Sequence, residues 1–295
     1  MSQGLGGRVV VGYEGGETGQ DALTFANRWA ATSHERVSVV TVHPGQAPAG
    51  LGRVDAEWVA YERAEADRLL QQARGLVAAG VSAEFSRVDA GSAAHGLSDA
   101  VEPGERDDGT LLVLGSRRNR GMRRTFPGST AERVLYGVGV PTVIVPWGYA
   151  DSEDHPLSRV AVAYVDTPEG RVAFDHGVRI ARRLSATLEV LSVVPDTRVV
   201  PGLGEARLFA TEQRQGYQAS LDAVVDRAPD DLVVTSRLLD GPVIDALSEL
   251  SLSDVDVLVT GSRGYGPVRR VLLGGVSSRV VRHSKVPVVV APRGG

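Results

Sequence analysis

Glycines and arginines cluster near the end of the chain in a pattern that could bind an anion. Gly261, Gly264 and Gly274 follow the spacing glycine, two residues, glycine, nine residues, glycine, between an apolar run and a helical pattern that begins near Val276. Glycine lets the backbone turn sharply or approach another group closely, and the amides at a helix N-terminus attract phosphate. The segment therefore predicts a phosphate-binding loop, with ordinary turn glycines as the alternative.

Other residues of this segment could complete such a site. Gly275 offers a main-chain amide, Ser277 could cap the helix or contact a phosphate, and Arg263 could neutralise phosphate charge. The loop is not of the Walker type, because the only lysine, Lys285, lies beyond the helix. The glycine spacing is also too wide for a dinucleotide fingerprint.

The chain is a tandem duplication. The segment LLVLGSR at Leu111 is repeated as VLVTGSR at Val257, and the opening RVVVGYEGGET at Arg8 is repeated as RVAVAYVDTPE at Arg159. We therefore expect an N-terminal domain over residues 1–148 and a C-terminal domain over residues 159–295. The polar, acidic residues 149–158 are expected to form a linker. The first copy of the glycine loop supplies four further candidate site residues: Gly115, Gly128, Ser129 and Thr130.

Each half alternates apolar runs with helical patterns. In the first half strands are expected at 9–11, 37–42, 83–88, 111–114 and 140–145, and helices at 19–31, 55–79, 93–101 and 130–136. Continuous apolar strands are typical of a parallel sheet covered by helices on both faces. The sequence thus predicts an α/β fold: two tandem doubly wound, Rossmann-like domains, each with a five-stranded parallel sheet. Ligands of such sheets bind beyond the carboxyl ends of the strands, where the glycine loop begins.

The helix over 55–79 shows a core-facing apolar stripe. It includes Ala66, Leu70 and Ala73, and Leu69 widens it on one side.

Composition excludes several classes of function. The 295 residues carry a net charge of −4 and no cysteine, which excludes disulfides and thiolate sites and argues against nucleic acid as a partner. No signal-like segment or membrane-length apolar run is evident, so we expect a cytoplasmic protein without a membrane partner. No catalytic triad or metal-binding spacing stands out, so we expect neither a catalytic residue nor a metal site, and no fast enzymatic turnover.

Both halves resemble the universal stress protein family. The resemblance rests on the opening strand and loop, the fourth strand ending in Gly-Ser-Arg, and the glycine signature followed by a helix and Val-Pro-Val. It implies a fold like that of the adenine nucleotide alpha-hydrolases and ATP as the cofactor, accompanied by Mg²⁺. It also implies that the two domains pair as an internal pseudo-dimer through the edge strands at 142–146 and 288–292, in an antiparallel arrangement, and it allows a homodimer.

This chain departs from the family pattern at several positions. Arg118 stands where the N-terminal loop should have its second glycine, so it should be strained or should reach into the pocket. The aspartate that contacts the nucleoside in the family is replaced by Glu14 in the first half, and Asp166 lies one position late in the second. The resemblance suggests Val88 or Leu239 as the backbone contact to adenine, with an ordinary Asp-Gly turn as the alternative. The arginine-rich run at 117–125 is either a phosphate patch or a solvated loop.

The resemblance implies regulation under stress: binding of an adenine nucleotide, more strongly by the C-terminal domain, changes the affinity for a regulatory protein partner. Two alternatives stay open. One is a nucleotide-free interaction module with degenerate motifs, and the other is a slow ATPase.

Overall fold

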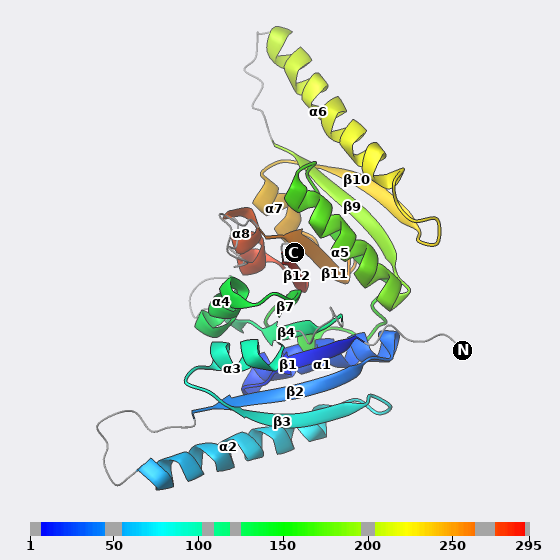
Figure 1. Ribbon diagram of the computed structural model, residues 1–295. Coiled ribbons are helices and arrows are strands. Elements are labelled where there is room, and N and C mark those ends of the chain that lie inside the picture. The colour runs from blue at the N-terminus through cyan, green and yellow to red at the C-terminus, as the bar shows by residue number, and fades with distance from the viewer. Residues whose placement is uncertain are drawn as a thin grey trace. The chain divides into compact units, whose positions relative to one another are not determined.

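Alternating strands and helices build both halves of the chain in the computed structural model (Figure 1). The structure describes residues 7–44, 55–101, 109–118, 125–195, 204–262 and 275–292. These residues fall into two compact units that divide between Pro156 and Leu157, the N-terminal unit and the C-terminal unit.

The N-terminal unit contains a parallel sheet with the strand order β7-β4-β1-β2-β3. Its elements are β1 (Arg8–Gly12), α1 (Gly16–Ser33), β2 (Arg36–His43), α2 (Asp55–Leu76), β3 (Ala83–Asp89), α3 (Ala93–Ala100), β4 (Leu111–Gly115), β5 (Arg117–Arg118), β6 (Thr125–Phe126), α4 (Gly128–Gly137), β7 (Thr142–Val145) and the 3-10 helix η2 (Tyr149–Asp151). The strand order reverses between β1 and β4, which defines the switch point where doubly wound folds bind ligands.

The C-terminal unit repeats this sheet with the order β12-β11-β8-β9-β10, again with parallel pairs. Its elements are β8 (Arg159–Ala163), α5 (Pro168–Leu184), β9 (Thr187–Val194), α6 (Gly204–Val225), β10 (Val234–Asp240), α7 (Val243–Ser248), β11 (Val257–Gly261), α8 (Gly275–His283) and β12 (Val288–Ala291). The expected fold class of tandem doubly wound domains is confirmed. The edge-strand pairing between the two domains stays a prediction.

Burial of the strands explains their continuous apolar sequences. Val9, Val10 and Val11 of β1 are fully buried, and every residue of β4 is buried as well. The outer strand β3 instead contains only half-buried and exposed residues, with the half-buried Ala83, Phe85 and Val88 among exposed ones. The central strands therefore hold the core, and their carboxyl ends are rigidly placed.

Helix α2 covers the sheet largely as its apolar stripe predicts. Ala66, Leu70 and Ala73 are buried, whereas the helix ends at Leu76, three residues before the predicted end. Leu69 is only half-buried, and it belongs to the wall of the cavity described in the next subsection.

The first residues of the predicted linker pack against α1. The carboxylate of Asp21 is buried and accepts hydrogen bonds from the amides of Gly148 (2.9 Å) and Ala150 (2.8 Å). Burial raises the pKa of Asp21, and these two hydrogen bonds act in the opposite direction. Tyr149 is buried against Phe25, with ring centroids 5.8 Å apart. The polar composition of the linker suggested a solvated segment, but backbone amides at its start are hydrogen-bonded to a buried carboxylate.

Arg28 of α1 holds the same segment from the other side. Its guanidinium lies 4.7 Å from the ring centroid of Tyr149 and donates to the carbonyl of Ser152 (2.8 Å), the hydroxyl of Ser152 (2.9 Å) and Asp154 (3.1 Å). The Arg28 side chain is only 6% exposed, so these partners replace its water. Removal of Arg28 should therefore cost these hydrogen bonds and the packing of a buried side chain against the Tyr149 ring.

We expect Arg28→Ala to lower the free energy of unfolding of the N-terminal unit by about 2 kcal/mol, the size of a lost buried charged hydrogen bond. All three tryptophans of the chain lie in this unit, so tryptophan fluorescence during denaturation reports its unfolding. Arg36→Ala is the control, since Arg36 is 64% exposed and pairs with Glu84 at 3.8 Å. Equal destabilisation by both variants would contradict the role of Arg28.

No helix within the described ranges is both long enough and apolar enough to cross a membrane.

Candidate functional site

A cavity of about 140 Å³ lies at the carboxyl ends of β1, β2 and β4 in the N-terminal unit. Its walls also include Leu69 of α2, Leu97 of α3 and the first turn of α4. The cavity thus occupies the switch point between β1 and β4 that the strand order predicts.

Gly115 is a glycine because two backbone segments touch at the end of β4. A Cβ atom at this position would lie 2.0 Å from the carbonyl oxygen of Thr18 in α1. Gly128 is a glycine for a different reason: its φ of +81° places the backbone in a conformation that residues with side chains rarely adopt. Both predicted loop glycines line the cavity.

The predicted strain at Arg118 is absent. Arg118 belongs to β5, which pairs with β6 in an antiparallel two-stranded ribbon. Among the described non-glycine residues, positive φ occurs only at His34 and Ser185. The hypothesis that arginine is strained here was wrong, because the ribbon keeps this residue extended.

The N-terminus of α4 forms the polar side of the cavity. Gly128, Ser129 and Thr130 begin the helix and line the cavity, and the preceding Pro127 provides no side-chain cap. The first amides of a helix have no partner within the helix. The structure therefore brings together three predicted site residues and a helix end suited to an anion.

An ion pair joins two further residues that line the cavity. Arg117 donates from Nε to Glu14 Oε1 (3.2 Å) and from Nη2 to Glu14 Oε2 (2.7 Å), so the pair is bidentate. This hydrogen bonding and the negative charge of Glu14 raise the pKa of Arg117. Arg117 ends the repeated segment LLVLGSR and begins the arginine-rich run, but it was not among the predicted site residues. Its equivalence to Arg263 in the second repeat was the signal that could have singled it out.

Part of the cavity lining is apolar. It is formed by Val40 and Val42 of β2, together with Leu97 and Leu114. Val88, the predicted contact to adenine, does not line the cavity and is paired with Val42 in the sheet. The contact between Val88 and adenine stays a prediction.

Tyr13 and Thr41 also line the cavity. The Thr41 hydroxyl donates to the carbonyl of Tyr13 (3.0 Å), and the Tyr13 side chain is buried. Burial raises the pKa of Tyr13, so its phenol stays protonated at neutral pH.

The C-terminal unit uses its equivalent residues differently. Gly261 again lies close to a helix, since its Cβ would be 2.8 Å from the carbonyl oxygen of Glu169. The hydroxyl of Ser277, predicted to contact phosphate, donates to the carbonyl of Gly261 (2.7 Å). Leu239 is a half-buried residue of the outer strand β10. Arg263, Gly264 and Gly274 lie outside the described residues.

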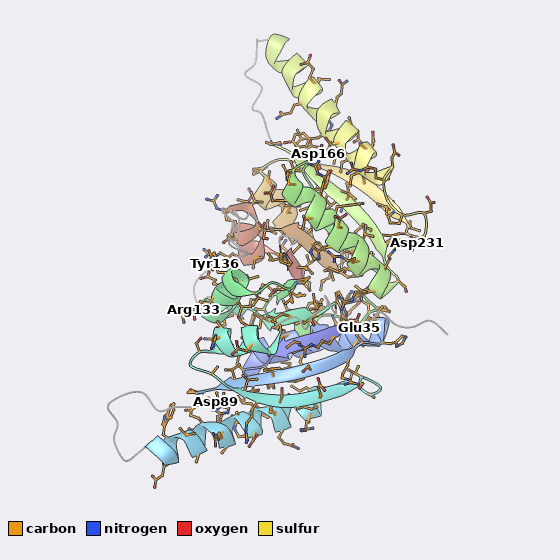
Figure 2. The ribbon with its side chains drawn as sticks, viewed as in Figure 1. Glu35, Asp89, Arg133, Tyr136, Asp166 and Asp231 are labelled. Atoms are coloured by element: carbon orange, nitrogen blue, oxygen red, sulfur yellow. The ribbon has the colours of Figure 1, made fainter. Side chains whose placement is uncertain are left out.

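Asp166 is held near the start of α5, where Figure 2 labels it. Its carboxylate pairs with Arg171 and accepts a hydrogen bond from the Tyr164 hydroxyl at 3.2 Å. Burial, followed by the charge of Asp166, raises the pKa of Tyr164. The N-terminus of α5 is capped by Thr167, which accepts from the Gly170 amide at 3.1 Å. The corresponding start of α1 has no side-chain cap.

Three polar positions of the N-terminal cavity are not polar in the C-terminal repeat. By repeat alignment, Glu14, Ser129 and Thr130 correspond to Val165, Gly275 and Val276. Val165 is 52% exposed and Val276 is 37% exposed. The two copies of the site have therefore diverged in polarity.

Within the part of the chain that the structure describes, no group of three histidine or acidic side chains is placed to hold a metal ion.

Comparison with known proteins gives consistent matches over the whole chain. A model of the Universal stress protein family matches residues 7–146 and 156–292. A universal stress protein of Mycobacterium tuberculosis strain H37Rv is 29% identical over 293 residues, covering 96% of this chain and 99% of the relative.

Solved structures show the same fold. A universal stress protein from Archaeoglobus fulgidus has a TM-score of 0.69 at 20% identity and covers 99% of this chain and 100% of its own. A putative universal stress protein from Pseudomonas aeruginosa has a TM-score of 0.58 at 16% identity, covering 98% and 94%.

Proposed function

This chain belongs to the universal stress protein family, and from this premise we propose that its N-terminal unit binds an adenine nucleotide as a regulatory ligand. ATP is the first candidate. The observation that carries the proposal is the cavity at the switch point, whose lining includes both apolar side chains and the uncapped N-terminus of α4. A nucleotide has the same division between an apolar base and anionic phosphates.

The cavity residues suit the two parts of such a ligand. Val40, Val42 and Leu97 offer apolar contacts to a base. The first amides of α4, with the hydroxyls of Ser129 and Thr130, offer donors to phosphate oxygens. Because the described residues contain no metal-binding group, Mg²⁺ would arrive with the phosphates and share their oxygens.

The described residues favour the N-terminal unit over the C-terminal one. The sequence pointed to the C-terminal loop because its glycine spacing is intact, but most of that loop lies outside the described residues. Where the C-terminal site is described, Gly275 and Val276 replace the hydroxyl residues Ser129 and Thr130, and Thr167 caps the neighbouring helix. These features reduce the number of donors available to a phosphate.

Binding without rapid hydrolysis is part of the proposal. Fast phosphoryl transfer needs a positioned base and metal ligands, and the cavity residues include no histidine and only one carboxylate, Glu14. A phosphate-release assay should therefore detect no rapid turnover, and vigorous ATP hydrolysis lost on Thr130→Val would make the protein an enzyme.

Thr130→Val tests the site with little change of shape. The variant introduces the residue type found at the equivalent Val276, and we expect ATP binding to weaken about tenfold or more because a hydroxyl donor to phosphate is lost. Equilibrium dialysis with ATP measures the effect. Thr235→Val, an exposed position in β10, is the matched control.

The outcomes separate the candidate functions. Unchanged ATP affinity in Thr130→Val would exclude the N-terminal cavity as the phosphate site. If the parent protein binds no adenine nucleotide and none is released from the purified chain in mass spectrometry, the interaction module without a ligand becomes the better account.

A further inference from the structure

The Glu14–Arg117 ion pair spans two loops that form the cavity. Glu14 follows β1, whereas Arg117 belongs to β5 after the end of β4. Among the described residues, both hydrogen bonds to the Glu14 carboxylate come from Arg117. The ion pair therefore connects the two sides of the switch point directly.

Arg117 also lies beside the start of α4. Its Cδ and Nε atoms are 3.9 and 4.0 Å from the position that a Gly128 Cβ would occupy. The pairing of β5 with β6 places Arg117 opposite Phe126, two residues before Gly128. A phosphate at the N-terminus of α4 would thus be close to the guanidinium without any movement of the backbone.

We propose that Glu14 and Arg117 form a latch, in which a ligand phosphate competes with Glu14 for the Arg117 guanidinium. This inference rests on the proposed nucleotide site. When the latch is closed, Glu14 occupies the donors of Arg117 and places a negative charge at the cavity. When a phosphate binds, Arg117 exchanges one bidentate anion for another. The pair therefore sets how strongly the site prefers phosphorylated ligands over an uncharged nucleoside.

Because both side chains of the pair are exposed, Arg117 can exchange Glu14 for a phosphate at a small cost in free energy. The side chains of Arg117 and Glu14 are 64% and 46% exposed, so neither is fixed by packing. Exposed ion pairs contribute little to stability, whereas arginine binds phosphate through short, charge-assisted hydrogen bonds. Opening the latch therefore costs less than the phosphate contact gains.

The C-terminal repeat cannot form the same latch. Val165 occupies the position of Glu14, and the nearby Asp166 pairs with Arg171 of α5. The latch is therefore a property of the N-terminal cavity alone among the described residues.

Substitution of each partner should have opposite effects on phosphate binding. In Glu14→Gln, Arg117 is free and a negative charge is removed, so ATP affinity should rise about threefold to fivefold. In Arg117→Met, ATP affinity should fall about tenfold or more. The ratio of ATP affinity to adenosine affinity should therefore rise in Glu14→Gln and fall in Arg117→Met, because only ATP carries the phosphates that Arg117 would bind.

The double variant Glu14→Gln/Arg117→Met distinguishes a latch from simple charge repulsion. With a latch, Glu14→Gln gives no gain once Arg117 is absent, whereas repulsion alone would preserve the gain. Asp67→Asn is the control. Asp67 pairs with Arg87 at the surface, so the substitution removes the same charge at a position outside the cavity.

Calorimetric titration measures the affinity of each variant for ATP and for adenosine, and circular dichroism checks that each variant is folded. A gain in ATP affinity in Glu14→Gln that depends on Arg117 supports the latch. An unchanged ratio of ATP to adenosine affinity in Glu14→Gln, while the parent protein binds ATP, overturns the latch and leaves the nucleotide site intact. If the parent protein binds neither ligand, the proposed function and the latch both fail.

Discussion

Alanine at position 115 is expected to abolish nucleotide binding by the N-terminal unit and to lower its free energy of unfolding by about 3 kcal/mol. The added Cβ would lie 2.0 Å from the Thr18 carbonyl oxygen, which is a backbone atom of α1. Gly115 is itself paired with Val145 in the sheet. Neither segment can withdraw without breaking hydrogen bonds, so α1 and β4 must separate at the wall of the cavity.

Gly75→Ala is a suitable control for this substitution. No atom lies within 4 Å of a Cβ at Gly75, which is inside helix α2. Alanine there should raise the free energy of unfolding by about 0.5–1 kcal/mol. Denaturation followed by tryptophan fluorescence measures both variants, and ATP dialysis measures binding. Retention of ATP binding and stability in Gly115→Ala would show that β4 and α1 are not in contact.

The C-terminal repeat shows the same close approach of strand and helix, with a less severe clash for an added Cβ. At Gly261, the equivalent position, the Cβ would be 2.8 Å from the Glu169 carbonyl oxygen. A contact at this distance needs a smaller displacement than one at 2.0 Å. The close approach of strand and helix is therefore common to both repeats, although the N-terminal one is tighter.

The general fold could be predicted from the sequence because the signals for it are local and repeated. Apolar runs at 9–11 and 111–114 are continuous, as expected for strands buried on both faces, and the second repeat supplies the same pattern independently. The element ends were less accurate. Helix α1 begins at Gly16 instead of residue 19, and β7 begins at Thr142 instead of residue 140.

The glycine positions of the site were predictable, but their physical reasons were not. Gly115 and Gly128 both appear in the signature, yet one avoids a steric clash and the other adopts a positive φ. The difference depends on how close α1 comes to β4. No local pattern encodes that distance.

Long-range side-chain contacts were missed for a similar reason. The Glu14–Arg117 pair joins residues 103 positions apart, and Arg28 contacts Ser152 across 124 positions. The sequence left the arginine-rich run open between a phosphate patch and a solvated loop, and it suggested no partner for Glu14. The parallel pairing of β1 and β4 brings Glu14 near Arg117, and the packing of α1 against η2 brings Arg28 near Ser152.

Asp256 is another buried charge, and its loss should be the most damaging change in the C-terminal unit. Its side chain is 0% exposed and accepts hydrogen bonds from the amides of Ser158 and Arg159, each at 2.8 Å. Arg159 also donates from Nη2 to Asp256 Oδ1 at 2.7 Å. These bonds connect the beginning of β8 to the residues that precede β11.

Asp256→Ala is expected to lower the free energy of unfolding of the C-terminal unit by about 3–5 kcal/mol, because Arg159 and two amides lose their buried acceptor. The C-terminal unit contains no tryptophan. Circular dichroism, which does not depend on tryptophan, should therefore show a transition at a lower denaturant concentration than in the parent protein. Asp231→Ala is the control, since Asp231 is 63% exposed and pairs with Arg182 at the surface. A shift of the tryptophan transition alone would contradict the assignment.

The pH dependence of stability provides a separate test of Asp256. Burial would raise the pKa of Asp256, but the hydrogen bonds from Arg159 and from the two amides outweigh it and hold this pKa below the usual range. A carboxylate with a lowered pKa stabilises the folded state fully above about pH 4, and this stabilisation is lost as the pH falls through the folded-state pKa. Asp256→Asn removes the titrating group, so the C-terminal transition of the variant should depend less on pH below about 4. Parallel acid dependence in the two proteins would mean that Asp256 gains no more from ionisation in the folded chain than in the unfolded one.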